Sequence, residues 1–140
     1  MKIQSLLYLI FPILFGNASM KPLQETKTVF VYAVITSAEF KKALFTDVFR
    51  ITIEKRNDSY LESAEKNLAV QKLEAAFKKH MYVTENWAKY VTVAGFYDDD
   101  YTKLTDRKLD EMSRQKRNDY TPMTTYNFSF TYKAGDAYKN

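Results

Sequence analysis

Cysteine is absent from this chain of 140 residues, and glycine, proline and histidine are scarce. Without cysteine the chain can form neither a disulfide, a Cys/His zinc site nor a Cys–His catalytic dyad. Three glycines and three prolines are too few for a disordered or loop-dominated protein. No serine-nucleophile motif, P-loop or dinucleotide-binding glycine pattern occurs. The chain is instead rich in aromatic residues, with 11 Tyr and 10 Phe, so its stability must come from an apolar core.

The charge is mildly positive, with 21 Lys and Arg against 17 Asp and Glu. Basic side chains alternate with acidic ones along the sequence and do not form a block. A nucleic-acid-binding surface is therefore not expected, because such surfaces concentrate basic residues.

The first 18 residues have the pattern of a secretory signal peptide. Lys2 precedes an apolar run over residues 3–15, and the small residues Gly16 and Ala18 favour cleavage after Ala18. The alternative is an uncleaved signal anchor, but the run is shorter than the roughly 20 residues that a membrane-spanning helix needs. We therefore expect an exported protein, periplasmic or extracellular, with no membrane span after cleavage. Residues 19–27 would form a lead-in linker, residues 28–133 a single domain, and residues 134–140 a C-terminal tail.

Two strands and a helix are predicted in the first half of the domain. Residues 28–35 are apolar on both faces, which is typical of an inner strand, and residues 44–53 form a second strand antiparallel to it. Ser59 and Glu62 match a capping box. A helix is therefore predicted from Ser59 to about Lys79.

The second half predicts strand, helix, strand. A β-rich run covers residues 90–96, and residues 125–132 alternate between aromatic and small polar side chains. Between them, an amphipathic helix over residues 101–117 begins after three aspartates and ends in basic residues. One side of this helix carries Tyr101, Leu104, Thr105, Lys108, Leu109 and Met112. We expect the helix to connect parallel strands by a right-handed crossover.

These elements predict an α+β fold with the order ββαβαβ. The expected architecture is a two-layer sandwich, in which a four-stranded mixed sheet carries both helices on one face. The opposite face would then be open to a ligand. It would present Arg50, Thr52, Tyr90, Thr92, Asn127 and Ser129, of which Arg50, Tyr90 and Asn127 are the candidate ligand-binding residues.

Three features were weighed as sites of chemistry. His80 is the only histidine and follows a helix end, where a structural or solvated role is expected. The run from Asp98 to Asp100 is not an EF-hand loop, because Lys103 and Leu109 occupy its sixth and twelfth positions, and a helix cap is the better interpretation. Asp47 falls among apolar positions of a strand, so it is buried, paired or located at a strand edge, and the edge is favoured. We therefore expect no catalytic group, metal or cofactor.

The chain resembles two groups of proteins. The hairpin formed by residues 29–35 and the sequence Phe45-Thr46-Asp47-Val48, followed by helix, strand, helix and strand, resembles small exported proteins of unknown function from Bacteroidetes-type bacteria. Residues 91–117, with Gly95 and Phe96 ahead of the acidic turn, are similar to the second half of the sporulation-related (SPOR) repeat. That second resemblance implies peptidoglycan binding.

The sequence thus favours a non-enzymatic exported domain that binds an unidentified protein or glycan of the cell envelope through an open sheet face. Peptidoglycan or glycan binding is the alternative. A third possibility is a hydrolase with a carboxylate pair that includes Asp47 or Asp98.

Overall fold

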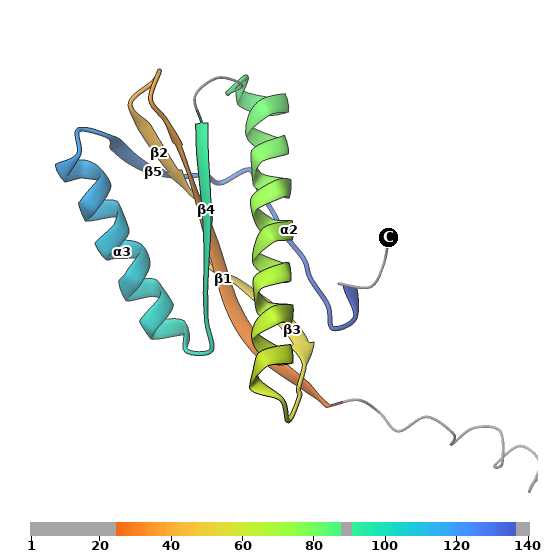
Figure 1. The fold of residues 1–140 in the computed structure, drawn as a ribbon. Coiled ribbons are helices and arrows are strands. Elements are labelled where there is room, and N and C mark those ends of the chain that lie inside the picture. Colours follow the sequence, from red (N-terminus) through yellow and green to blue (C-terminus); the bar gives the residue numbers. More distant parts are fainter. Residues whose placement is uncertain (1–24, 88–90, 137–140) are drawn as a thin grey trace, which may run out of the picture.

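The computed structural model describes residues 25–87 and 91–136, and Figure 1 shows its fold. Within these ranges the elements are β1 Thr26–Ser37, β2 Lys42–Phe45, β3 Phe49–Glu54, α2 Ser59–Glu85, β4 Val91–Asp98, α3 Tyr101–Arg117 and β5 Thr121–Thr124. The α+β class, the mixed sheet and the two helices are confirmed, although the sheet has five strands and not four. The predicted signal peptide and Tyr90 lie outside the described residues.

Strand β1 is the centre of the sheet. It pairs antiparallel with β4 along one edge, and with β3 and then β2 along the other. Strand β5 adds to β2 in parallel. Because β2 and β4 both run opposite to β1, β4 and β5 have the same direction. The last two strands are therefore parallel, as predicted, although the final strand is β5 and not residues 125–132, and β1 and β2 lie between them.

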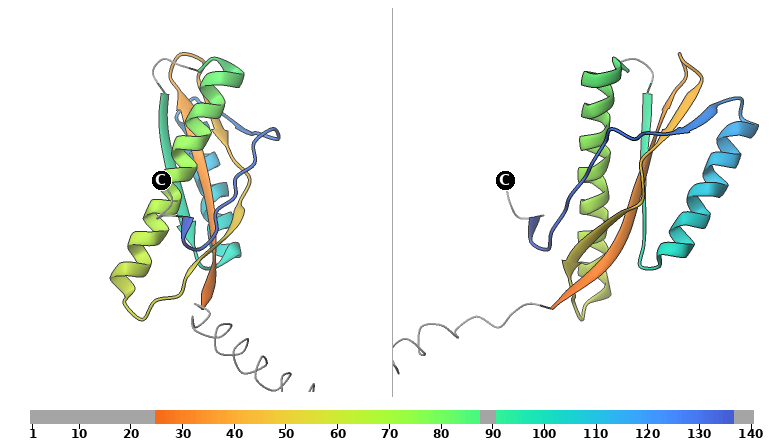
Figure 2. Two further views of the ribbon diagram at one scale, coloured as in Figure 1. Left: turned by 90° about the vertical axis from the view of Figure 1, so that its right-hand side faces the viewer. Right: turned by 180° about the vertical axis from the view of Figure 1, so that it is seen from behind.

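The two helices cover opposite faces of the sheet. Alternate residues of β1, from Val29 to Ile35, pack with Leu73 and Phe77 of α2. The intervening residues Tyr32 and Val34 pack with Leu104 of α3. Figure 2 shows the strands between the two helices. The structure thus corrects the two-layer arrangement with both helices on one face: β1 is apolar on both sides, and each side needs its own cover.

The strand predicted over residues 44–53 is interrupted by Thr46. Its backbone N–H donates to Ala33 O over 2.9 Å, and its Oγ1 accepts the Ala33 N–H over 3.0 Å. The Thr46 hydroxyl thus takes the place of a backbone acceptor for the Ala33 N–H. The regular pairing with β1 is interrupted at this point, and Asp47 is exposed to solvent. The strand-edge interpretation of Asp47 is confirmed, because β3 begins only at Phe49.

Aspartates cap both helices. Asp58, and not the predicted Ser59, is the N-cap of α2, and its carboxylate accepts the N–H groups of Tyr60 and Leu61. Asp100 caps α3 by accepting the Lys103 N–H. Helix α2 continues six residues beyond the predicted end, as far as Glu85.

The aromatic segment over residues 125–132 is not a strand of the sheet, which corrects the prediction. The strand that follows α3 is β5, and the chain then leaves the sheet. Phe128 and Phe130 are nevertheless half-buried against the α2 core, and Tyr132 is buried in it. The alternation correctly indicated one buried side, because any extended chain that packs on one side has the same period.

Candidate functional site

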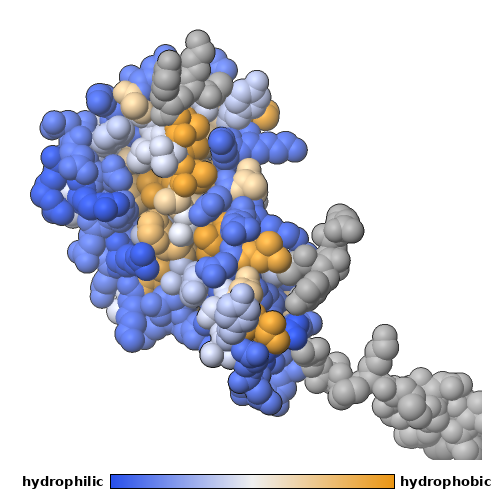
Figure 3. Space-filling model, viewed as in Figure 1, coloured by the Kyte–Doolittle hydropathy of each residue, from blue (hydrophilic) through white to orange (hydrophobic). Residues whose placement is uncertain are grey.

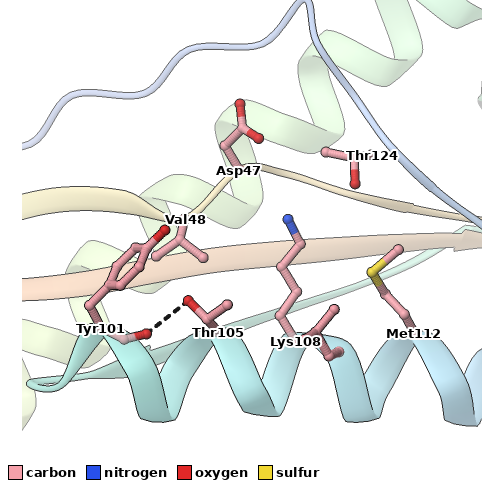
Figure 4. A pocket seen from close by; sticks show the side chains of 8 residues that line it. Asp47, Val48, Tyr101, Thr105, Lys108, Met112 and Thr124 are labelled. Atoms are coloured by element: carbon pink, nitrogen blue, oxygen red, sulfur yellow. Dashed lines mark hydrogen bonds between the residues drawn. The ribbon is translucent and has the colours of Figure 1, made fainter.

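A groove lies between α3 and the turn that joins β2 to β3. It has a volume of about 490 Å³ and is lined by Asp47, Val48, Tyr101, Thr105, Lys108, Leu109, Met112 and Thr124. Figure 4 shows the side chain of Lys108 rising from α3 toward the strands, with Val48 and Tyr101 on one side of it and Met112 on the other. We call this feature the α3 groove.

Lys108 is the charged centre of the α3 groove. Its side chain is half-buried, and this burial lowers the pKa of its amine, while the negative charge of Asp47 opposes that shift. No ion pair joins Lys108 to Asp47 or to any other carboxylate in the described part of the chain. The ammonium has therefore given up water without gaining a direct partner.

The walls around this amine are mainly apolar. Tyr101 and Leu109 are 53% and 57% exposed, although their spacing predicted the buried side of the helix. Leu104 is the α3 residue that is fully buried. The backbone oxygen of Tyr101 accepts the hydroxyl of Thr105 over 2.8 Å, as the dashed line in Figure 4 marks. The apolar stripe of α3 is thus wider than the sheet beneath it, and its outer part lines the α3 groove.

A second group of ionisable residues lies at the turn between β4 and α3, on the side of α2. Lys27 contacts Glu62 and Asp99, each over 2.6 Å, and Lys66 contacts the same two carboxylates over 3.4 and 2.8 Å. The hydrogen bond from Lys27 lowers the pKa of Glu62. Each of these four charged side chains contacts an opposite charge. The group therefore joins β1, α2 and the β4–α3 turn.

No family model, curated protein or solved structure matches the chain. The α3 groove is therefore interpreted from its own residues.

The predicted site residues do not form one surface. Arg50 is exposed on β3, opposite Phe30, and Asn127 is exposed in the segment that follows β5. Tyr90 lies outside the described residues. The prediction placed Arg50 and Asn127 on the open face of the sheet, but Asn127 is not in a strand and α3 covers part of that face.

His80, Asp47 and Asp98 are the residues that the sequence offers for metal or carboxylate chemistry. His80 lies within α2 and not after its end, and its ring contacts that of Phe128 with centroids 5.2 Å apart and planes tilted by 56°, in keeping with a structural role. Over residues 25–87 and 91–136, no three His, Asp or Glu side chains group as metal ligands would, and no helix is long and apolar enough to cross a membrane. Asp98 accepts the N–H of Asp100 in the β4–α3 turn, while Asp47 lines the α3 groove together with an amine. The carboxylate pair expected of a glycosidase-type hydrolase is thus not what lines this groove.

Sequence reasoning missed Lys108 as a site residue. The signal was present, because a lysine on the apolar side of an amphipathic helix must be buried or lie at a boundary. Its neighbour Asp47 belongs to a turn 61 positions earlier, and no spacing rule connects the two.

Proposed function

We propose that this chain is a non-enzymatic binding domain whose ligand combines an apolar body with an anionic group and occupies the α3 groove. The observation that carries the proposal is Lys108, a half-buried amine without an ion-pair partner, surrounded by Val48, Tyr101, Leu109 and Met112. Ligand sites typically combine apolar walls with a few polar groups that fix the orientation of the ligand. A carboxylate at Lys108 would replace the water that the amine has lost, while the apolar body would cover Leu109 and Tyr101.

Asp47 sets the selectivity of this site. Asp47 lines the same groove, so its negative charge disfavours a second negative charge on the ligand and favours a hydrogen-bond donor at that end. The preferred ligand therefore carries one acidic group. As an exported protein, which the N-terminal segment predicts, the domain would meet such ligands in the cell envelope.

The direct test is a titration of the purified protein with decanoate and, in parallel, with uncharged decanol, followed by backbone amide NMR shifts. We expect decanoate to shift residues of α3 and the β2–β3 turn. Lys108→Met should weaken decanoate binding by roughly tenfold or more, because a hydrogen bond to a charged group contributes about 1.5–3 kcal/mol. The same substitution should leave decanol binding nearly unchanged.

Lys103→Met is the matched control, because Lys103 is exposed on the same helix and does not line the α3 groove. Asp47→Asn should tighten decanoate binding. Equal losses in the Lys103 and Lys108 variants, or shifts confined to another surface, would refute the proposal.

Glycan binding is a second candidate, in line with the resemblance to the SPOR repeat. The observation that favours it is the exposed ring of Tyr101 at the α3 groove, since an aromatic face can pack on a sugar ring while its hydroxyl stays in water. Retention of the protein on isolated sacculi, lost in Tyr101→Ala and kept in Lys108→Met, would favour this candidate over the first.

A further inference from the structure

The outer edge of β4 is the longest strand edge in the described sheet that no other strand pairs with. Strand β4 spans eight residues and, within residues 25–87 and 91–136, pairs only with β1. The other flank of the sheet is divided among the shorter strands β3, β2 and β5. Free N–H and C=O groups along such an edge can pair with another strand.

The direction of these groups follows from the pairing of β1. Ala33 uses both its N–H and its C=O on Thr46, so Gly95, which lies opposite Ala33 on the other side, points its own groups away from β1. By alternation, Val91, Val93, Gly95 and Tyr97 all present backbone groups outward. The backbone N–H and C=O groups of the remaining β4 residues point toward β1 and form the hydrogen bonds between the two strands.

One backbone group of this edge has a side-chain partner. The carboxylate of Glu74, on α2, accepts the Gly95 N–H over 2.7 Å. Natural sheets usually protect edges with lysine, proline or bulges, but no proline or charged residue occurs from Val91 to Tyr97. Figure 3, which looks onto this edge, shows a strip of hydrophobic side chains between the two helices, over β4.

We propose that this edge pairs with β4 of a second copy of the chain, antiparallel about a two-fold axis at Ala94. This register joins Val91 to Tyr97, Thr92 to Phe96 and Val93 to Gly95 across the junction. β-Branched residues then face aromatic ones, which is a favourable cross-strand pairing, and no like charges meet from Val91 to Tyr97. The small residues Ala94 and Gly95 at the centre let the two strands approach.

The helices support a second copy as the occupant. Helix α2 lies over β1 and β4, with Val70 and Glu74 against Gly95. In the proposed pair, the two α2 helices would be centred two strand spacings apart, which is about 10 Å. Helices pack at about 8–10 Å, so the pair would gain a helix–helix contact that an isolated peptide strand does not offer.

Association requires the Glu74 carboxylate to release the Gly95 N–H, because in the proposed register this N–H donates to the backbone C=O of Val93 in the second copy. Glu74 is thus a competitor of the proposed pairing. Replacing it by alanine should tighten the dimer.

The absence of cysteine makes a clean test possible. In the proposed register the two Ala94 residues form a non-hydrogen-bonded pair with Cα atoms about 4.5 Å apart, which is within the range of about 4.4–6.8 Å that a disulfide spans. The full chain carrying Ala94→Cys is expressed, purified in the form that the cell produces, and oxidised. It should give a covalent dimer. Ser113→Cys is the control, since Ser113 is exposed on α3 and is not part of the β4 edge. We expect roughly tenfold more covalent dimer for Ala94→Cys, because pairing raises the effective thiol concentration.

Val93→Pro provides the second arm. Proline removes an N–H that faces away from β1, which an edge strand tolerates, and it blocks pairing on that side. The unmodified chain should sediment as a concentration-dependent dimer, and Val93→Pro as a monomer with unchanged far-UV circular dichroism. A monomer at every concentration, a dimer that survives Val93→Pro, or equal cross-linking of the two cysteine variants would overturn the proposal.

Discussion

Lys108 carries a cost for folding that can be measured apart from any ligand. Burial lowers the pKa of its amine, which means that the folded state disfavours the charged form. Below the folded-state pKa this penalty is present in full, and it disappears as the pH rises through the folded pKa toward the unfolded value of about 10.4.

Lys108→Met should therefore stabilise the protein at neutral pH, by roughly 0.5–1 kcal/mol. Methionine has a helix propensity similar to that of lysine, so α3 itself is not perturbed. Urea unfolding at pH 7 and at pH 10 checks this, and the difference between variant and parent should shrink at the higher pH. Lys103→Met is again the control, and a Lys108→Met protein less stable than the parent at pH 7 would contradict the expectation.

Among the elements, α2 and β4 are held at close range by the absence of a side chain at Gly95. A Cβ placed there would lie 2.4 Å from Val70 Cγ1 and 3.0 Å from Glu74 Oε1. Gly95→Ala therefore requires the Val70 and Glu74 side chains, or α2 as a whole, to shift, and we expect a loss of about 1–3 kcal/mol in the free energy of unfolding. Combining it with Val70→Ala should recover part of this loss, with a coupling of roughly 1 kcal/mol in a double-mutant cycle. Losses that simply add would show that the contact is not the cause.

The sequence specified single elements better than their arrangement. The bounds of α3 follow from Asp100 and the closing basic residues, and they agree with the structure. The prediction of an inner strand is confirmed for β1, and its two apolar faces imply cover on both sides. The prediction of both helices on one face is wrong, because the aromatic segment after residue 125 is not a strand and the sheet is covered on both sides. Period two reports a buried side, and not a hydrogen-bonded partner.

The same limit applies to the α3 groove. The position of Lys108 on its helix is a local property, which the 3.6-residue period carries. That Asp47 lies across from it depends on Thr46 breaking a strand, which in turn depends on a side-chain hydrogen bond to Ala33. No periodic pattern of residues in the sequence indicates whether a backbone N–H will donate to a backbone or to a side-chain acceptor.

At the scale of the whole molecule, the end of the described chain closes the core that α2 shares with the sheet. The Phe128 ring lies 5.8 Å from that of Phe49 on β3, and 5.0 Å from that of Phe77 on α2, measured between centroids. Segments separated by about 80 and 50 positions are thus joined at one aromatic cluster. We therefore expect sheet, helix and final segment to unfold as one unit.

Phe128→Ala should therefore lower the free energy of unfolding by roughly 2 kcal/mol, since the ring is half-buried and its removal leaves a gap between Phe49 and Phe77. Tyr126→Ala, two residues earlier in the same segment, removes a ring that is 87% exposed and should change stability by no more than about 0.5 kcal/mol. Thermal unfolding followed by near-UV and far-UV circular dichroism measures both effects. In Phe128→Ala the two signals should shift together, because the aromatic cluster joins the sheet to α2. If the near-UV signal were lost well before the far-UV signal, the final segment would be a separate unit that detaches while sheet and helices persist.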